Sequence, residues 1–144
     1  MLSNTCKYAI RAVLYLAVNS ESGQKIGIKQ ISKELDIPTP FLGKILQSLA
    51  KHKLLSSTKG PNGGFGIGKK PEELLLMDIV QIIDGMDGFH KCIIGVRYCS
   101  ELENPCALHT RYAELREEIR KIFEVETIEI LANNIRDGKQ VFVI

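Results

Sequence analysis

The sequence lacks any apolar run that approaches the roughly 20 residues needed to cross a bilayer. It also lacks a secretory signal, because the apolar stretch Val13–Val18 after Lys7 and Arg11 is too short for one. We therefore expect a cytoplasmic protein with no membrane partner. Cysteine is scarce, with four residues in the chain. In a reducing compartment these favour metal binding or redox chemistry over structural disulfides.

Acidic residues are missing from residues 37–71, although this stretch carries six lysines. Residues 72–144 instead carry fourteen acidic and eight basic residues, so the net charge of the whole chain is only +2. A surface that faces phosphates needs such an acid-free segment, since carboxylates there would repel the nucleic-acid backbone. A solvated lysine-rich face would have the same composition, so the positions of the lysines must decide between the two.

Apolar periodicity predicts three helices in the first part of the chain, over residues 5–19, residues 28–35 and from Pro40 to about Lys53. Thr39 is the expected N-cap of the third helix, with Pro40 at its first position. Two short helices joined by a tight turn, the second with an exposed polar face, are typical of a helix-turn-helix. The expected buried stripe of the third helix consists of Phe41, Leu42, Ile45, Leu46 and Leu49.

A basic β-hairpin is predicted directly after the third helix, with strands at 54–59 and 65–69 around the turn Gly60–Gly64. A hairpin at this position is typical of a wing, which lies along a phosphate strand or enters the minor groove. We expect the DNA-binding residues on the exposed face of the third helix and on the wing, although each is otherwise an ordinary solvated side chain. They are Thr39, Lys44, Gln47, Lys51, Lys59 and Asn62.

The second half of the chain predicts a fourth helix over residues 72–86 and, after a long irregular segment, a long helix from Pro105 to about Asn133. Apolar residues of the long helix alternate by four and three, as in a coiled-coil seam. The seam predicts a homodimer, although packing on the first helix would cover part of it. Its residues are Leu108, Tyr112, Leu115, Ile119 and Ile122.

The expected fold class is therefore mainly α with a small β-hairpin wing. The expected organisation is a winged helix-turn-helix DNA-binding domain over residues 1–86 and a cysteine-bearing loop over residues 87–106. A dimerisation helix and a C-terminal tail follow over residues 107–144.

Three cysteines and a histidine form a candidate metal site. Six residues lie between Cys92 and Cys99 and between Cys99 and Cys106, and His109 follows three positions after Cys106. Cys106 and His109 are expected in the first turn of the long helix, on one face. Three thiolates and an imidazole suit zinc or an iron–sulfur cluster. The six-residue gaps between these cysteines are longer than the gaps between paired cysteine ligands in structural zinc sites, so they fit zinc poorly. Incidental thiols are the alternative, and Cys6, on an apolar helix face, is expected to be a core residue.

A resemblance to a known family lies in the three cysteines and in four segments, Tyr8–Ala12, Ile31–Leu35, Leu54–Phe65 and Asp78–Gly85. With these features the chain resembles the IscR/NsrR-type winged-helix regulators of bacteria. The resemblance implies a homodimer that binds a pseudo-palindromic operator in double-stranded DNA. It also implies an iron–sulfur cluster held by Cys92, Cys99 and Cys106, with His109 at the position of the fourth ligand in regulators that carry a [2Fe–2S] cluster.

The chain departs from this family at two places. The gaps between its cysteines are longer than in the closest family pattern. Its predicted recognition helix carries Pro38, Pro40, Phe41 and Gly43 where relatives often carry residues that contact bases. The operator sequence of a relative therefore does not carry over to this chain.

Two other hypotheses arise from the same residues. A regulator without a cluster would use its cysteines as a thiol switch or hold zinc. Gly63–Lys69 also matches the G-x-x-x-x-G-K pattern of a nucleotide-binding loop, but Lys70 stands where a Mg²⁺-binding hydroxyl is needed. The chain also lacks a βαβ series to surround such a loop, so we expect a regulator and not an enzyme.

Overall fold

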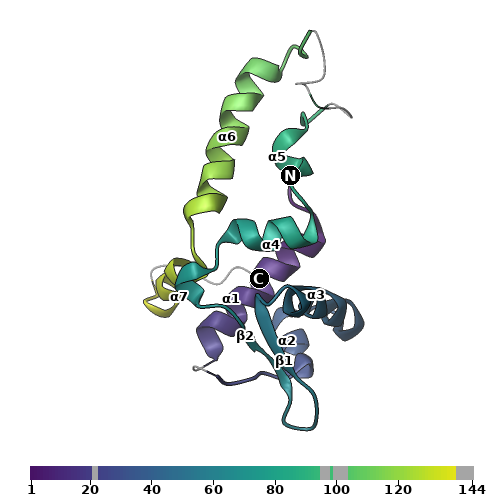
Figure 1. Cartoon of the computed structure of the whole chain (residues 1–144), viewed down its shortest axis with the longest axis vertical. Coiled ribbons are helices and arrows are strands. Elements are labelled where there is room, and N and C mark those ends of the chain that lie inside the picture. The colour runs from purple at the N-terminus through teal and green to yellow at the C-terminus, as the bar shows by residue number, and fades with distance from the viewer. Residues whose placement is uncertain (21–22, 95–97, 99–103, 139–144) are drawn as a thin grey trace.

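A computed structural model describes residues 1–20, 23–94, 98 and 104–138. Within these residues the fold is mainly helical, with β1 and β2 paired in one antiparallel hairpin, and the expected fold class is confirmed. No helix in the described part of the chain is long and apolar enough to span a bilayer. The elements in Figure 1 are α1 (Asn4–Asn19), α2 (Ile28–Leu35), α3 (Thr39–Lys51), β1 (Leu55–Thr58), β2 (Gly64–Ile67), the 3₁₀ turn η1 (Pro71–Glu73), α4 (Leu76–Ile83), α5 (Asp87–His90), α6 (His109–Val125) and α7 (Ile128–Arg136).

The N-terminal body is built around α1, which contacts α2, α3, α4, α7 and β2. Ala9, Val13 and Leu16 recur on one face of α1 and are fully buried against these elements. Leu42 and Leu46 of α3 fill the same core, and each buried leucine stabilises the fold by roughly 1.5–3 kcal/mol. The body therefore positions α3 and the wing rigidly with respect to each other.

Helix α3 differs from its prediction in three details. Pro38 is the N-cap and Thr39 is already helical, because the Thr39 hydroxyl donates to Ser32 Oγ instead of accepting from the first turn. The helix ends at Lys51, and Lys53 has a positive φ of 63°. Phe41 is 38% exposed and meets the Tyr8 ring edge-on, with 5.8 Å between ring centroids. Phe41 therefore lies at the rim of the core and not in its buried stripe.

The predicted boundaries of two helices are wrong, because two backbone hydrogen bonds hold the chain extended where helix was predicted. Leu76 N donates to Glu126 O at 3.1 Å, and Ile128 N donates to Leu74 O at 2.8 Å. The chain is extended at Leu75 and at Thr127, where these bonds form a short antiparallel bridge. Consequently α4 begins at Leu76 instead of residue 72, and the predicted long helix is divided into α6 and α7.

Helix α6 also begins later than predicted. It begins at His109 with Leu108 as N-cap, so the predicted start at Pro105 is wrong and Cys106 precedes the helix. His109 N donates to Cys106 O at 2.9 Å in the turn that leads into the helix. The expected arrangement of Cys106 and His109 on one helical face is therefore wrong.

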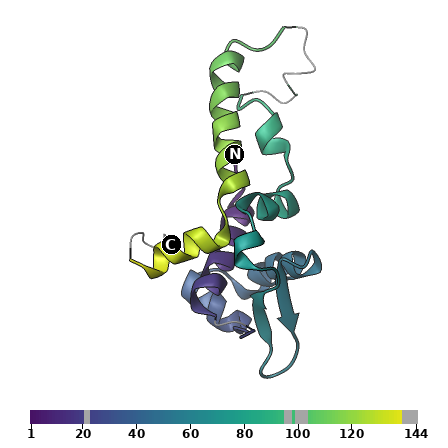
Figure 2. The same ribbon diagram turned by 60° about the vertical axis from the view of Figure 1, so that its left-hand side comes forward.

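The two parts of the predicted long helix have different surroundings. Helix α7 packs along α1 in the N-terminal body, whereas α6 projects from it (Figure 2). No residue of α6 is fully buried. Ile119 and Phe123 pack against a second small core of Cys6, Met77, Val80 and Phe89 at the base of α6. Among the other members of the predicted seam, Tyr112 is half-buried, whereas Leu115 and Ile122 are exposed, at 57% and 53%.

Two glycines of the wing allow a stability test. Both have a positive φ, 108° at Gly60 and 154° at Gly64, but a Cβ at Gly60 would meet open space. A Cβ at Gly64 would lie 2.3 Å from Ile26 O, which pairs with Phe65 N. We expect Gly60→Ala to lower the free energy of unfolding by about 1 kcal/mol and Gly64→Ala by about 3 kcal/mol. Urea denaturation measures both values, and equal losses would contradict a backbone clash at Gly64.

Candidate DNA-binding surface and cysteine site

The turn between α2 and α3 is held by Ser32. Its hydroxyl donates to Ile37 O at 2.5 Å and accepts from the Thr39 hydroxyl at 2.9 Å. Asp36, in a left-handed conformation with φ of 52°, ends α2. These local bonds fix the angle between the two helices, so the motif has the helix-turn-helix form that the sequence predicts. Ser32 was not among the predicted site residues, because a serine on a polar helix face gives no distinguishing signal.

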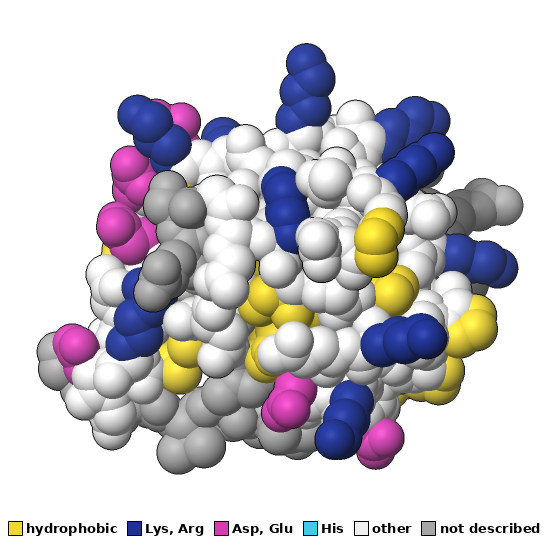
Figure 3. All heavy atoms as spheres, turned by 90° about the horizontal axis from the view of Figure 1, so that it is seen from below, with side chains coloured by type: hydrophobic (Ala, Val, Ile, Leu, Met, Phe, Trp, Pro, Cys, Tyr) yellow, Lys and Arg dark blue, Asp and Glu magenta, His cyan; other side chains and the backbone are white. Residues whose placement is uncertain are grey.

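The candidate contact residues of α3 lie on its exposed face. Lys44, Gln47 and Lys51 are all exposed, at helical spacing along one side. Thr39 is half-buried and already donates a hydrogen bond within the turn. Seen from below, Lys and Arg side chains are spread over this end of the molecule, with acidic side chains mainly at the margin (Figure 3). The surface that α3 presents therefore combines cationic and hydrogen-bonding groups.

The wing carries the remaining candidate contacts at its tip. Lys59 and Asn62 are exposed in the turn between β1 and β2, where Gly63 N donates to Gly60 O at 3.0 Å. At the base of the wing, Lys69 pairs with Asp78 at 3.2 Å. The tip lysine is thus available for a phosphate, while the base lysine is partly neutralised.

The nucleotide-binding-loop hypothesis is wrong. Residues 64–67 of the Gly63–Lys69 match form strand β2, and Ser56, Ser57 and Thr58 of β1 lie opposite Gly66, Phe65 and Gly64. A phosphate-binding loop instead connects a strand to the N-terminus of a helix. The match therefore comes from the glycine content of the wing.

The cysteine site brings together two of its four predicted members. Cys92 Sγ and Cys106 Sγ lie 3.4 Å apart, although the residues are 14 positions apart in the sequence. His109 is half-buried at the start of α6, and Cys99 lies outside the described residues. Among the described residues no group of three or more Cys, His, Asp and Glu is close enough to hold a metal ion.

A set of polar contacts holds the backbone beside Cys92. Arg116 of α6 donates from the same nitrogen to His90 O and to Lys91 O, at 3.1 Å each. Asp87 accepts from Lys91 Nζ at 2.5 Å and from the Tyr98 hydroxyl at 2.7 Å. These two bonds, the one from Lys91 more than the one from Tyr98, lower the pKa of Asp87 below its ordinary value. The sequence did not indicate Arg116, because its partners are backbone carbonyls about 25 residues away.

Cys6 belongs to the core and not to the cysteine site. It is completely buried beside Met77, Val80 and Phe89. Burial, with a smaller contribution from Asp84, raises the pKa of the Cys6 thiol to about 12. The thiol is therefore protonated at neutral pH and unsuited to binding a metal, as the sequence predicted for a core cysteine.

A family model described as Rrf2, an iron-dependent transcriptional regulator, matches residues 2–134. The chain belongs to the Rrf2 family. It is accordingly a DNA-binding transcriptional regulator and not an enzyme. The predicted resemblance to IscR/NsrR-type regulators is confirmed by relatives within this family.

Three relatives of this Rrf2 protein indicate how far the similarity extends. A protein of Aquifex aeolicus, named provisionally as an HTH-type transcriptional regulator, is 34% identical over 134 residues, which cover 92% of each chain. The HTH-type transcriptional regulator IscR of Klebsiella pneumoniae is 28% identical over 133 residues, covering 92% of this chain and 80% of IscR. The structure of CymR, the global cysteine regulator of B. subtilis, superposes with a TM-score of 0.76 at 19% identity, covering 92% of this chain and 96% of CymR. At that identity the likeness to CymR shows the fold alone.

Proposed function

We propose that this Rrf2 protein is a homodimeric regulator whose affinity for a pseudo-palindromic operator is controlled by an iron–sulfur cluster. The ligands would be Cys92, Cys99 and Cys106, with His109 as the fourth, and the cluster would be of the [2Fe–2S] type. The family description as iron-dependent and the relationship to IscR support this proposal.

The distance between Cys92 Sγ and Cys106 Sγ is the observation that carries the proposal. Two thiolates bound to one metal at about 2.3 Å in a tetrahedral arrangement lie roughly 3.8 Å apart. The observed 3.4 Å is close to that spacing. Thiolate sulfur is also the ligand that iron–sulfur clusters require, so the residues present fit the group.

DNA contacts are proposed for the exposed face of α3 and the tip of the wing. Lys44, Gln47 and Lys51 would lie in the major groove, and Lys59 and Asn62 would contact the backbone or the minor groove. The Thr39 hydroxyl oxygen would accept a hydrogen bond from DNA, since its proton is already donated to Ser32 Oγ within the turn. A dimer would place two copies of α3 on half-sites about 34 Å apart.

Dimerisation is proposed through the exposed apolar stripe of α6. Leu115 and Ile122 of this projecting helix and Leu108 at its N-cap recur every seven residues. Their exposure in the described chain is unfavourable in water, and a second copy of the same stripe is the symmetrical way to cover it. The stripe is narrower than predicted, since Ile119 is used within the chain.

Contacts of the chain itself connect the cysteines to the DNA-binding body. When bound, an iron–sulfur cluster supplies a reversible one-electron couple and a site of reaction with nitric oxide. Arg116 links the backbone before Cys92 to α6. Phe89 links the same segment to α4 and α1, and its ring meets Phe123 with 5.6 Å between centroids. A rearrangement at Cys92 would therefore shift α6 relative to the body and change the spacing of the two recognition helices.

The experiment that tests cluster binding is anaerobic purification followed by visible absorption and by iron and sulfide assays. We expect charge-transfer bands with iron and sulfide in matching amounts for the wild type, and their loss in Cys92→Ser. Cys6→Ala is the matched control and should retain the colour, because Cys6 is buried in another core. A colourless, iron-free wild type that still binds DNA would overturn the cluster and leave the DNA-binding function standing.

A thiol switch without a cluster is the second candidate, and the same sulfur pair favours it. The 3.4 Å separation would need to fall only to about 2.05 Å to form a disulfide. Two thiols would then lose two protons and two electrons to a cellular oxidant such as a peroxide. A colourless protein whose Cys92 and Cys106 become linked on mild oxidation would establish this mechanism, and stoichiometric zinc in the same preparation would favour a zinc-holding regulator.

A further inference from the structure

A pocket of about 420 Å³ lies where the end of α1, the loop before α2, the base of the wing and the end of α7 meet. Its cationic lining residues are Lys25, Lys69, Lys70 and Arg136, and none of its lining residues within the described chain is acidic. Its volume falls within the range of about 300–1,000 Å³ that small-molecule sites occupy. The pocket therefore has the size and the sign of charge that suit a small anion.

Lys69 and Lys70 are partly neutralised from outside the pocket. Lys69 pairs with Asp78 at 3.2 Å and Lys70 with Glu73 at 3.8 Å. Both carboxylates line a larger neighbouring cavity of about 670 Å³, which consequently has mixed charge. The excess positive charge of the smaller pocket thus comes mainly from Lys25 and Arg136.

Lys25 is held in place by a neutral partner. Its Nζ donates to Ser56 Oγ of β1. To reach Ser56 the side chain passes over Gly66 of β2, where a Cβ would lie 3.3 Å from Lys25 Cδ. No carboxylate of the described chain forms an ion pair with Lys25. Within the described residues the lysine is therefore positioned without a carboxylate that pairs with its charge.

Arg136 is also positioned by neutral acceptors. Its guanidinium donates to Ala17 O at the end of α1 and, at 3.0 Å, to Asn133 Oδ1. A guanidinium has five N–H donors, so others remain for a ligand. No acid in the described residues forms an ion pair with it. Two preorganised cations from distant parts of the chain thus line one pocket.

We propose that this pocket binds a small organic anion through a phosphate or carboxylate group, with Lys25 and Arg136 as its main charged partners. Charge-assisted hydrogen bonds to both residues would give the site its affinity. Lys25 is attached to the wing and Arg136 to the end of α1, so the ligand would tie the wing to α7. The regulator would then have a ligand-binding site that is separate from its cysteines.

The test titrates the intact protein with inorganic pyrophosphate and with citrate in separate calorimetric experiments at constant ionic strength. We expect saturable binding of at least one probe, which identifies the preferred group as phosphate or carboxylate. Lys25→Met and Arg136→Gln should each weaken that binding by at least about tenfold, because each removes a charged hydrogen-bond donor. Circular dichroism should show that both variants are folded, and Lys25→Met keeps the test valid if Arg136→Gln is unstable.

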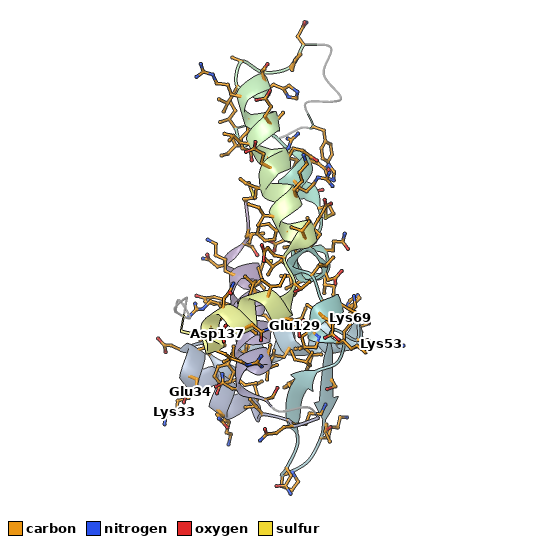
Figure 4. The ribbon with its side chains drawn as sticks, turned by 90° about the vertical axis from the view of Figure 1, so that its left-hand side faces the viewer. Lys33, Glu34, Lys53, Lys69, Glu129 and Asp137 are labelled. Carbon is orange, nitrogen blue, oxygen red and sulfur yellow. The ribbon has the colours of Figure 1, made fainter. Side chains whose placement is uncertain are left out.

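Two control variants separate this site from other cationic surfaces. Lys33→Met changes an exposed lysine of α2 on the other side of the body from Lys69 (Figure 4) and should bind the probe like the wild type. Lys44→Ala, on the proposed DNA-binding face, should also leave the probe affinity unchanged. Equal affinity in wild type, Lys25→Met and Arg136→Gln would overturn the proposal. It would also be overturned if neither probe bound saturably, or if only Lys44→Ala weakened the binding.

Discussion

Replacing Leu115 and Ile122 with aspartate is expected to convert the proposed dimer into a monomer. The two side chains are 57% and 53% exposed on α6, seven residues apart, so they would lie at the centre of a two-helix seam. Four carboxylates in the dimer interface would have to be desolvated without partners, which costs several kcal/mol. Light scattering coupled to gel filtration should show the mass of one chain where the wild type shows two.

Loss of the dimer should in turn weaken operator binding by about a hundredfold or more, because the second half-site would no longer benefit from linkage to the first. The matched control is Thr110→Asp with Lys121→Asp, two exposed positions on the other side of α6. This control should remain a dimer and bind the operator normally. A dimer that survives the Leu115 and Ile122 substitutions would exclude the α6 stripe as the interface.

Lys44→Glu is expected to weaken operator binding by about a hundredfold. Lys44 lies on the exposed face of α3, and the substitution replaces an attraction to DNA with a repulsion in both half-sites of a dimer. Fluorescence anisotropy on a duplex selected from a random pool, repeated over a range of salt concentrations, measures the effect. If Lys44 contacts a phosphate, the slope of log affinity against log salt should fall in magnitude by about 0.9 for each half-site.

Lys121→Glu is the control for this charge reversal, because it makes the same change on α6, far from α3 and the wing. Its operator affinity and salt dependence should match those of the wild type. If Lys44→Glu also matched the wild type, α3 would not be the recognition helix.

Elements determined by local signals were predicted closely from the sequence. Helix α2 spans the predicted residues 28–35, and the wing lies within the predicted hairpin. At the ends of these segments glycines permit backbone conformations that other residues avoid, and prolines fix φ, so both effects are local and do not depend on distant residues. The burial of Leu42, Ile45, Leu46 and Leu49 follows from helical periodicity in the same way.

Features that depend on distant partners were missed. The break between α6 and α7 arises because Glu126 and Ile128 bond to the backbone at Leu74 and Leu76, some 50 residues earlier. The hydrogen bonds from Arg116 to the backbone carbonyls of His90 and Lys91 likewise join residues that are distant in the sequence. Backbone groups carry no sequence signature, so no periodicity in either segment could have indicated these contacts.

The structure brings Cys92 and Cys106 together, but the ligand set that these two residues would form with Cys99 and His109 remains a prediction. The expected helical placement of Cys106 failed, because the helix begins only at His109. The spacing of the cysteines predicts the members of the site, whereas the backbone around Cys92 depends on contacts between α5 and α6.

The bridge between Leu75 and Thr127 holds the chain after α6 beside the chain before α4, so the segment from the end of α4 to Thr127 is an excursion from the body. The chain leaves the body after α4, forms the cysteine-bearing segment and α6, and returns to pack α7 on α1, so both ends of the excursion are fixed at neighbouring points (Figure 1). Its length can therefore change with little disturbance of the main core, as for an inserted loop whose ends are already joined. In such an architecture the cysteine-bearing segment can be altered while the body that carries α3 and the wing stays intact.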